Sequence, residues 1–82
     1  MTDSETLRSE VIEIVADIAE LEVHEVSPEA RLEDLGVDSL GGLRIVAAVE
    51  KKYGLIIDEK KIGQIRTMPD IFALVEQHAD EV

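Results

Sequence analysis

The chain has 82 residues, 19 acidic and 8 basic, which gives a formal net charge of -11. This charge excludes nucleic acid as a partner, because a surface that binds phosphates needs clustered Lys and Arg. The absence of cysteine excludes disulfides and thiolate metal sites, and it fits the reducing cytosol, so we expect a cytoplasmic protein.

A chain this short is expected to form one domain, residues 1–82, and to remain a monomer. Its only aromatic residues are Tyr53 and Phe72, so the core must be aliphatic. The longest apolar run, residues 45–49, is far too short for a membrane span, and the N-terminus lacks the features of a signal peptide. The acids are concentrated in residues 1–38, with 12 acids and 2 bases, against 7 acids and 6 bases in residues 39–82.

An amphipathic helix is predicted from about Asp3 to about Leu21, because apolar residues recur every three or four positions with acids between them. This periodicity fades over residues 22–38, where Ser27-Pro28 and Gly36 indicate a loop. The loop carries apolar side chains that we expect to anchor it: Val23, Val26, Leu32, Leu35 and Val37. A loop of this length in so small a domain is usually functional.

A second helix is predicted to begin at Asp38 or Ser39 as its N-cap and to run to about Tyr53, where Gly54 stops it. Its expected inward stripe comprises Leu40, Leu43, Val46, Val49 and Tyr53, widened by Ile45, Ala47 and Ala48.

The remainder of the chain predicts two more helices. Residues 55–57 form an extended link, after which Asp58 caps a short helical turn that ends near Gln64. The last helix begins near Met68, with Pro69 in its first turn. The sequence therefore predicts an all-α fold, a small four-helix bundle with a long first loop and a short third helix.

The stretch from Asp34 to Leu40, Asp-Leu-Gly-Val-Asp-Ser-Leu, places a serine where the loop ends and the second helix begins. It resembles the signature of acyl carrier proteins, in which the serine of an Asp-Ser-Leu triplet receives 4′-phosphopantetheine from coenzyme A. The resemblance covers essentially the whole chain, including helix order and length. It implies a stand-alone acyl carrier with the cofactor attached to Ser39, with Asp38 and Leu40 beside the attachment site.

The position of Ser39 also suits a phosphodiester on physical grounds. The free N–H groups and the dipole at a helix N-terminus favour an anion by about 0.3–1 kcal/mol. Gly36 is expected to supply the sharp turn that exposes the serine. The alternative is that Ser39 is an ordinary N-cap with no further role.

Other chemistries do not fit the sequence. The nucleophile elbow of hydrolases needs Gly two residues before the serine, whereas Gly36 lies three residues before Ser39. A calcium loop that began at Asp34 would need an acid at its twelfth position, which is Ile45. The two histidines are interpreted as surface or packing residues: His24 and His78. We therefore predict no catalytic residue and no metal site, and a protein that is a substrate for enzymes rather than an enzyme.

The resemblance further implies a docking surface for partner enzymes on the second helix: Leu40, Arg44, Ala47, Glu50 and Lys51. Carriers that serve fatty acid synthesis have acids there, whereas five of the eight basic residues of this chain lie between positions 44 and 61. The acids of those carriers meet basic patches on their partner enzymes, which the basic residues of this chain would repel. Such like charges at a docking face lower the association rate. We therefore expect a phosphopantetheinyl transferase and the acyl-loading, condensing or acyl-transfer enzymes of a specialised pathway such as polyketide synthesis, ahead of housekeeping fatty acid synthesis.

Members of this family can fold an acyl chain between the second and third helices. The resemblance implies that the lining of such a cleft is Leu43, Val46, Ile57, Ile62 and Ile65. Because Ile62 stands where a small residue is common, we expect a narrow cleft that suits short or polar cargo. Gly41 and Gly42 are expected to let the arm or a partner approach the backbone closely.

Two alternatives stay open at this point. An aminoacyl or peptidyl carrier protein would share the serine and the bundle. A non-carrier acidic helical module that binds a basic partner would need no covalent arm.

Overall fold

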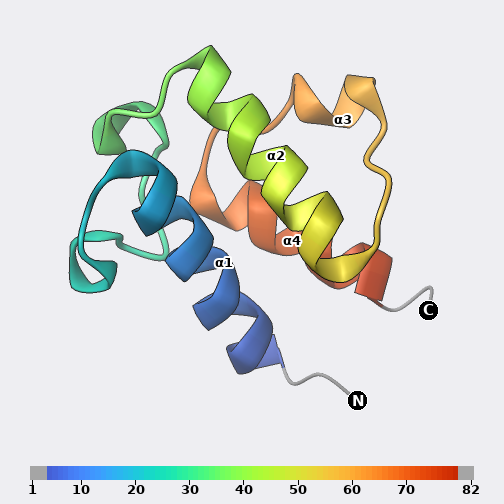
Figure 1. The fold of residues 1–82 in the computed structure, drawn as a ribbon, viewed down its shortest axis with the longest axis horizontal. Coiled ribbons are helices and arrows are strands. Elements are labelled where there is room, and N and C mark those ends of the chain that lie inside the picture. The colour runs from blue at the N-terminus through green and yellow to red at the C-terminus, as the bar shows by residue number, and fades with distance from the viewer. Residues whose placement is uncertain (1–3, 80–82) are drawn as a thin grey trace.

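The computed structural model of the protein describes residues 4–79. Its α-helices are α1 (Ser4–Ala19), α2 (Ser39–Tyr53), α3 (Glu59–Ile62) and α4 (Met68–Ala79). The long helices α1, α2 and α4 form the body of the bundle, and α3 is a short turn on the path from α2 to α4 (Figure 1). The predicted all-α bundle with a long first loop and a short third helix is confirmed. The predicted start at Asp3 lies outside the described residues.

The helix ends follow local backbone rules. α1 ends at Ala19, two residues before the expected end, because Glu20 adopts a left-handed conformation with φ of 60°. Without glycine at this position, the conformation costs roughly 1–2 kcal/mol. The N–H of Leu21 donates to the carbonyl oxygen of Ala16 at 2.8 Å and closes the helix. α2 ends as predicted, with Gly54 at φ of 67°.

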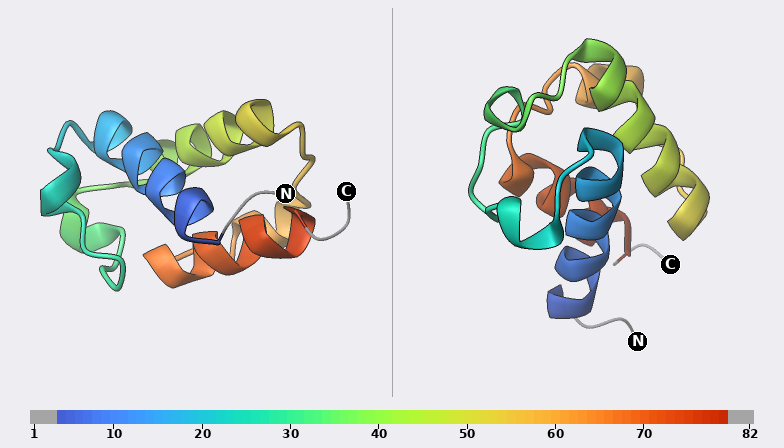
Figure 2. Two further views of the ribbon diagram at one scale, coloured as in Figure 1. Left: turned by 90° about the horizontal axis from the view of Figure 1, so that it is seen from below. Right: turned by 60° about the vertical axis from the view of Figure 1, so that its left-hand side comes forward.

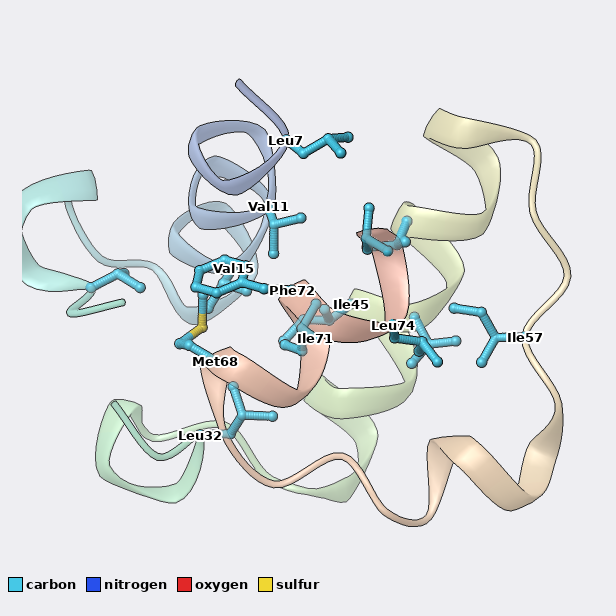
Figure 3. Packing of buried hydrophobic residues seen from close by; sticks show 14 of the residues in the cluster. Leu7, Val11, Val15, Leu32, Ile45, Ile57, Met68, Ile71, Phe72 and Leu74 are labelled. Atoms are coloured by element: carbon cyan, nitrogen blue, oxygen red, sulfur yellow. The ribbon is translucent and has the colours of Figure 1, made fainter. Parts of the chain in front are cut away.

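The core lies between α1, α2 and α4 and is almost entirely aliphatic (Figure 3). The largest side chains that are less than 2% exposed are Val11, Val15, Ile45, Val49, Met68 and Val75. Phe72 is 5% exposed and is the one aromatic side chain among the buried residues of the described chain. Burial of each such aliphatic side chain contributes about 1.5–3 kcal/mol, so packing alone holds a domain without disulfides.

The inward face of α2 differs from the predicted stripe. Ile45, Val46 and Val49 are buried, whereas Leu40 is 70% exposed and Leu43 is 52% exposed. The reason is geometric, because each step of three residues turns 300° and so falls about 60° short of a full turn. The stripe from Leu40 to Val49 therefore winds from the outside of the helix to the inside, and only its second half reaches the core.

A polar contact joins α1 to the last turn of α2. The Tyr53 hydroxyl donates to Glu10 Oε2 at 2.8 Å, and Lys52 Nζ lies 3.8 Å from the same oxygen. Burial, followed by the hydrogen bond to Glu10 and the charge of Glu10, raises the pKa of Tyr53 above its ordinary value of 10.0. This contact fixes the angle between the two helices at the end of α2 remote from Ser39.

The long first loop contains two short 3₁₀ turns, Val23–Glu25 and Glu33–Leu35, that the sequence did not predict. Of the expected anchors, Val26 and Leu32 are buried and Leu35 and Val37 are half-buried. Val23 is 51% exposed and does not anchor the loop. The loop runs along one end of the bundle and reaches the segment that precedes α4 (Figure 2).

Backbone hydrogen bonds fix the loop to that segment. The N–H of Leu32 donates to the carbonyl oxygen of Arg66 at 3.0 Å, and the N–H of Met68 donates to that of Ala30 at 2.9 Å. An isolated antiparallel bridge between Arg31 and Thr67 lies between these bonds. The loop that leads to Ser39 is therefore fixed to the segment that precedes α4.

A reciprocal cap begins α4. The Asp70 carboxylate oxygen Oδ2 accepts from the N–H of Arg66 at 3.0 Å and of Thr67 at 3.1 Å. The N–H of Asp70 donates to Thr67 Oγ1 at 3.3 Å. These hydrogen bonds hold the pKa of Asp70 below its ordinary value of 3.8, and the bond from the N–H of Arg66 has the largest effect.

We expect Asp70→Asn to lower the free energy of unfolding by about 1 kcal/mol at pH 7, because the ionised cap is lost. A lowered pKa in the folded state stabilises the fold above the unfolded pKa and ceases to do so as pH falls through the folded pKa. The difference between wild type and Asp70→Asn should therefore shrink below pH of about 4. Urea unfolding at pH 7 and at pH 3 measures it, and a difference that is equal at both values would contradict the cap.

Candidate functional site

The N-terminus of α2 presents Ser39 as its first residue, and Ser39 is exposed. The N-cap is Asp38, whose Oδ1 accepts from the N–H of Gly41 at 2.8 Å. Among the hydrogen bonds of the described residues, none involves the Ser39 hydroxyl. The alternative that Ser39 merely caps the helix is therefore wrong, because the neighbouring aspartate does so and leaves the serine hydroxyl in solvent.

A tight turn just before the helix accounts for this exposure. Gly36 has φ of 79°, and its N–H donates to the carbonyl oxygen of Glu33 at 3.1 Å. The N–H of Val37 donates to the carbonyl oxygen of Leu32 at 3.0 Å. Because Leu32 is buried and Gly36 reverses the chain, Asp38 and Ser39 project from the end of the bundle, as the role predicted for Gly36 requires.

The same geometry fits a phosphate group at Ser39. The first N–H groups of a helix lack intrahelical acceptors. Asp38 satisfies the N–H of Gly41 with its side chain and that of Gly42 with its carbonyl oxygen at 2.9 Å. The N–H groups of Ser39 and Leu40 remain for an anion, at the positive end of the helix dipole.

A broad depression with a volume of about 980 Å³ lies beside Ser39. Four of the five residues predicted for the acyl cleft line it, and they come from α2, from α3 and from the segment that follows α3: Leu43, Val46, Ile62 and Ile65. Gly42 and Gly63, which have no side chains to fill the space, are also in its wall. Ile62 is part of this wall, and the expectation of a narrow cleft that suits short or polar cargo stays a prediction.

The fifth predicted residue, Ile57, does not line the depression. Its side chain is 5% exposed and belongs to the core, whereas that of Ile56 is 88% exposed. Glu50 Oε2 accepts from the N–H of Ile57 at 2.8 Å and holds the extended link against α2. Because successive side chains of an extended segment point in opposite directions, this bond directs Ile57 inward and Ile56 outward.

The residues predicted for partner docking divide into two groups. Four are exposed on one side of α2: Leu40, Arg44, Ala47 and Lys51. Glu50 is only partly exposed, and its carboxylate is occupied by the N–H of Ile57. This hydrogen bond fixes the link after α2, and the docking role of Glu50 stays a prediction.

The opposite wall of the depression was not predicted from the sequence. Arg31, Glu33, Arg66 and Thr67 contribute to it. These residues come together through the bridge between the first loop and the segment before α4, which joins positions far apart in the chain. A periodicity search finds pairs three or four residues apart and cannot detect such a contact.

The remaining predictions concern metals and histidines. Among residues 4–79, no group of three or more His, Asp or Glu side chains could hold a metal ion. His24 is exposed in the first loop, and the side chain of His78 lies outside the described residues. No helix within the described part of the chain is long and apolar enough to cross a membrane.

Comparisons with known proteins agree with this geometry. A family model described as a phosphopantetheine attachment site matches residues 9–75. The chain is 30% identical over 79 residues to an acyl carrier protein of Rickettsia bellii, with 95% of this chain and 98% of the relative covered. It is 39% identical over 74 residues to polyketide-8 synthase acyl carrier protein 2 of Streptomyces avermitilis, with 89% and 80% covered.

The fold is shared with a solved structure. The acyl carrier protein from Thermotoga maritima superposes with a TM-score of 0.83 at 24% sequence identity, and the match covers 95% of this chain and 92% of that one. The likeness shows that the two chains share a fold, a small helical bundle.

The chain belongs to the phosphopantetheine attachment site family, with acyl carrier proteins among its relatives. It is a carrier rather than a catalyst, and its prosthetic group is a covalently attached 4′-phosphopantetheine. Its partners are a phosphopantetheinyl transferase and biosynthetic enzymes.

Proposed function

We propose that this carrier holds acyl intermediates as thioesters on 4′-phosphopantetheine attached to Ser39 Oγ. One observation supports this assignment above the others: Asp38 caps α2, so the exposed hydroxyl of Ser39 is free of protein partners among the described residues. The arm would supply a thiol that reaches from Ser39 to partner active sites. The protein's own residues would anchor the phosphate, with the N–H groups of Ser39 and Leu40 directed at the anion.

The attachment reaction conserves atoms and charge. Ser39 Oγ forms a bond to the phosphorus that carries pantetheine, and the phosphoanhydride bond of coenzyme A breaks. Adenosine 3′,5′-bisphosphate leaves, and the hydroxyl proton passes to the transferase or to water. The magnesium ion and the base that this step needs would be supplied by the transferase.

Ser39→Ala is expected to abolish modification completely. Intact-protein mass spectrometry after incubation with coenzyme A and a broad-specificity phosphopantetheinyl transferase measures the result. We expect a single adduct on the wild type and none on Ser39→Ala. Ser27→Ala is the control, because Ser27 is an exposed serine of the first loop and its removal should leave the adduct intact. An adduct that persists on Ser39→Ala would place the arm elsewhere.

The pathway remains part of the proposal. We infer a role in polyketide or related specialised synthesis, supported by the basic residues of α2 and by the similarity to a polyketide synthase carrier. The sequence-based expectations of a single domain over residues 1–82, a monomer and a cytoplasmic location stay predictions. An aminoacyl or peptidyl carrier is the second candidate, because such a carrier would use the same serine. Competitive loading with acyl-coenzyme A and aminoacylating enzymes separates the two.

A further inference from the structure

The opposite wall of the depression carries two arginines that the attachment of the arm does not use. Arg31 comes from the first loop and Arg66 from the segment before α4, and both line the depression beside Ser39. The side that α2 and α3 supply is apolar, with Leu43 and Ile62. The depression therefore has one side that suits hydrocarbon and another that presents positive charge.

The backbone holds the bases of both arginine side chains in place. An antiparallel bridge joins Arg31 to Thr67. The carbonyl oxygen of Arg66 accepts from the N–H of Leu32 at 3.0 Å, and the N–H of Arg66 donates to Asp70 Oδ2 at 3.0 Å. Because both segments are fixed, two guanidinium groups need little ordering to bind one ligand, and such preorganisation favours affinity.

Among residues 4–79, neither guanidinium group has a strong ion-pair partner. Arg66 forms no ion pair with any of these residues. Arg31 Nη1 lies 4.0 Å from Glu33 Oε1, and the two side chains are 70% and 78% exposed, so this pair is weak. The Asp70 carboxylate, whose charge interacts with that of Arg66, is occupied by backbone N–H groups, and the Asp38 carboxylate caps α2. Both arginines therefore keep N–H donors for a ligand.

We propose that Arg31 and Arg66 bind a carboxylate at the far end of the acyl cargo, so that the depression favours cargo that ends in a carboxyl group over cargo that ends in a methyl group. The methylene groups of such a cargo would lie against Leu43 and Ile62. Guanidinium groups match the planar geometry of a carboxylate, and these charge-assisted hydrogen bonds are stronger than neutral ones. A methyl end at this wall would instead take water from the arginines without replacing its hydrogen bonds. The inference rests on the proposed attachment at Ser39, because the arm would enter the depression from there.

The first test measures the pKa of the carboxyl group of the cargo itself. A broad-specificity phosphopantetheinyl transferase attaches the acylated arm from hexanedioyl-coenzyme A with an isotopically labelled free carboxyl group, and intact mass confirms the product. Carbon NMR then follows the labelled carboxyl group against pH in the wild type and in two double variants. Arg31→Gln/Arg66→Gln removes both cations of the wall. Arg44→Gln/Lys51→Gln is the matched control, because it removes the same charge from exposed positions of α2 that do not line the depression.

We expect the carboxyl pKa to rise by about 0.5 or more in Arg31→Gln/Arg66→Gln, because two cations that favour the ionised form are lost. In Arg44→Gln/Lys51→Gln the rise in this pKa should stay below about 0.2, since salt screens more distant exposed charges. Equal rises in the two variants, or no rise in either, would overturn the inference.

A second test separates the carboxylate of the cargo from the phosphate of the arm. The Nε–H resonances of Arg31 and Arg66 are compared in the apo protein, in the holo protein with a free thiol, and in the forms loaded with a hexanoyl or a hexanedioyl group, which differ only at the far end. We expect both resonances to shift with the hexanedioyl group and to shift little with the hexanoyl group. Equal shifts with the two groups, or a shift already on conversion from apo to holo, would overturn the inference. A missing adduct would instead show by mass, before any NMR measurement, that the attachment at Ser39 has failed and the inference with it.

Discussion

Ile45→Ala is expected to lower the free energy of unfolding by about 3 kcal/mol, because the lost methyl groups leave a cavity in a packed core. Ile45 is 1% exposed and lies between the helices of the bundle (Figure 3). Leu43→Ala, two residues earlier on the same helix, should cost less than about 1 kcal/mol, because Leu43 is 52% exposed. The contrast is large for a domain whose total stability is of the order of 5–15 kcal/mol.

Urea unfolding followed by circular dichroism measures both variants. The midpoint should shift strongly for Ile45→Ala and slightly for Leu43→Ala, with unchanged denaturant slopes. Both substitutions leave helix propensity nearly unaltered or improved, so the comparison reports packing. Equal midpoints for the two variants would mean that α2 is rotated about its axis relative to this structure.

The same helix shows how much of the fold could be predicted from the sequence. The bounds of α2 depend on local signals: Asp38, one of the two predicted N-caps, begins the helix, and Gly54 ends it as predicted. Which side of α2 faces inward depends on where α1 and α4 lie, and the sequence allowed a stripe that winds around the helix. Ile45 was predicted only to widen that stripe, but it is among the most deeply buried residues of α2.

The site was predictable to the extent that it is local. The Asp34–Leu40 motif predicted an exposed serine after a glycine turn, and Gly36 has the positive φ that the turn needs. The positions of Glu50 and Ile57 were not predictable, because both depend on a hydrogen bond between side chain and backbone seven residues apart. The Arg31–Thr67 bridge joins still more distant positions.

The two glycines after Ser39 have different structural roles, although the sequence suggested the same one for both. A Cβ atom at Gly41 would lie 3.0 Å from Val37 Cγ1 and 3.3 Å from the capping oxygen Asp38 Oδ1. A Cβ atom at Gly42 would meet nothing within 4 Å and would project at the wall of the depression. A side chain at position 41 would therefore crowd Val37 and the cap, whereas Gly42 leaves space that the fold does not use.

We expect Gly41→Ala to destabilise the protein by about 1 kcal/mol, because crowding against half-buried Val37 and the cap exceeds the gain in helix propensity. Gly42→Ala should instead stabilise it by about 0.5 kcal/mol, since only the propensity gain remains. Urea unfolding of the apo proteins tests the opposite signs. The rate of modification at Ser39 then tests the close approach: a slower rate in the more stable Gly42→Ala protein would mean that the transferase or the arm occupies the open space. An unchanged rate would mean that neither the transferase nor the arm occupies the space beside Gly42.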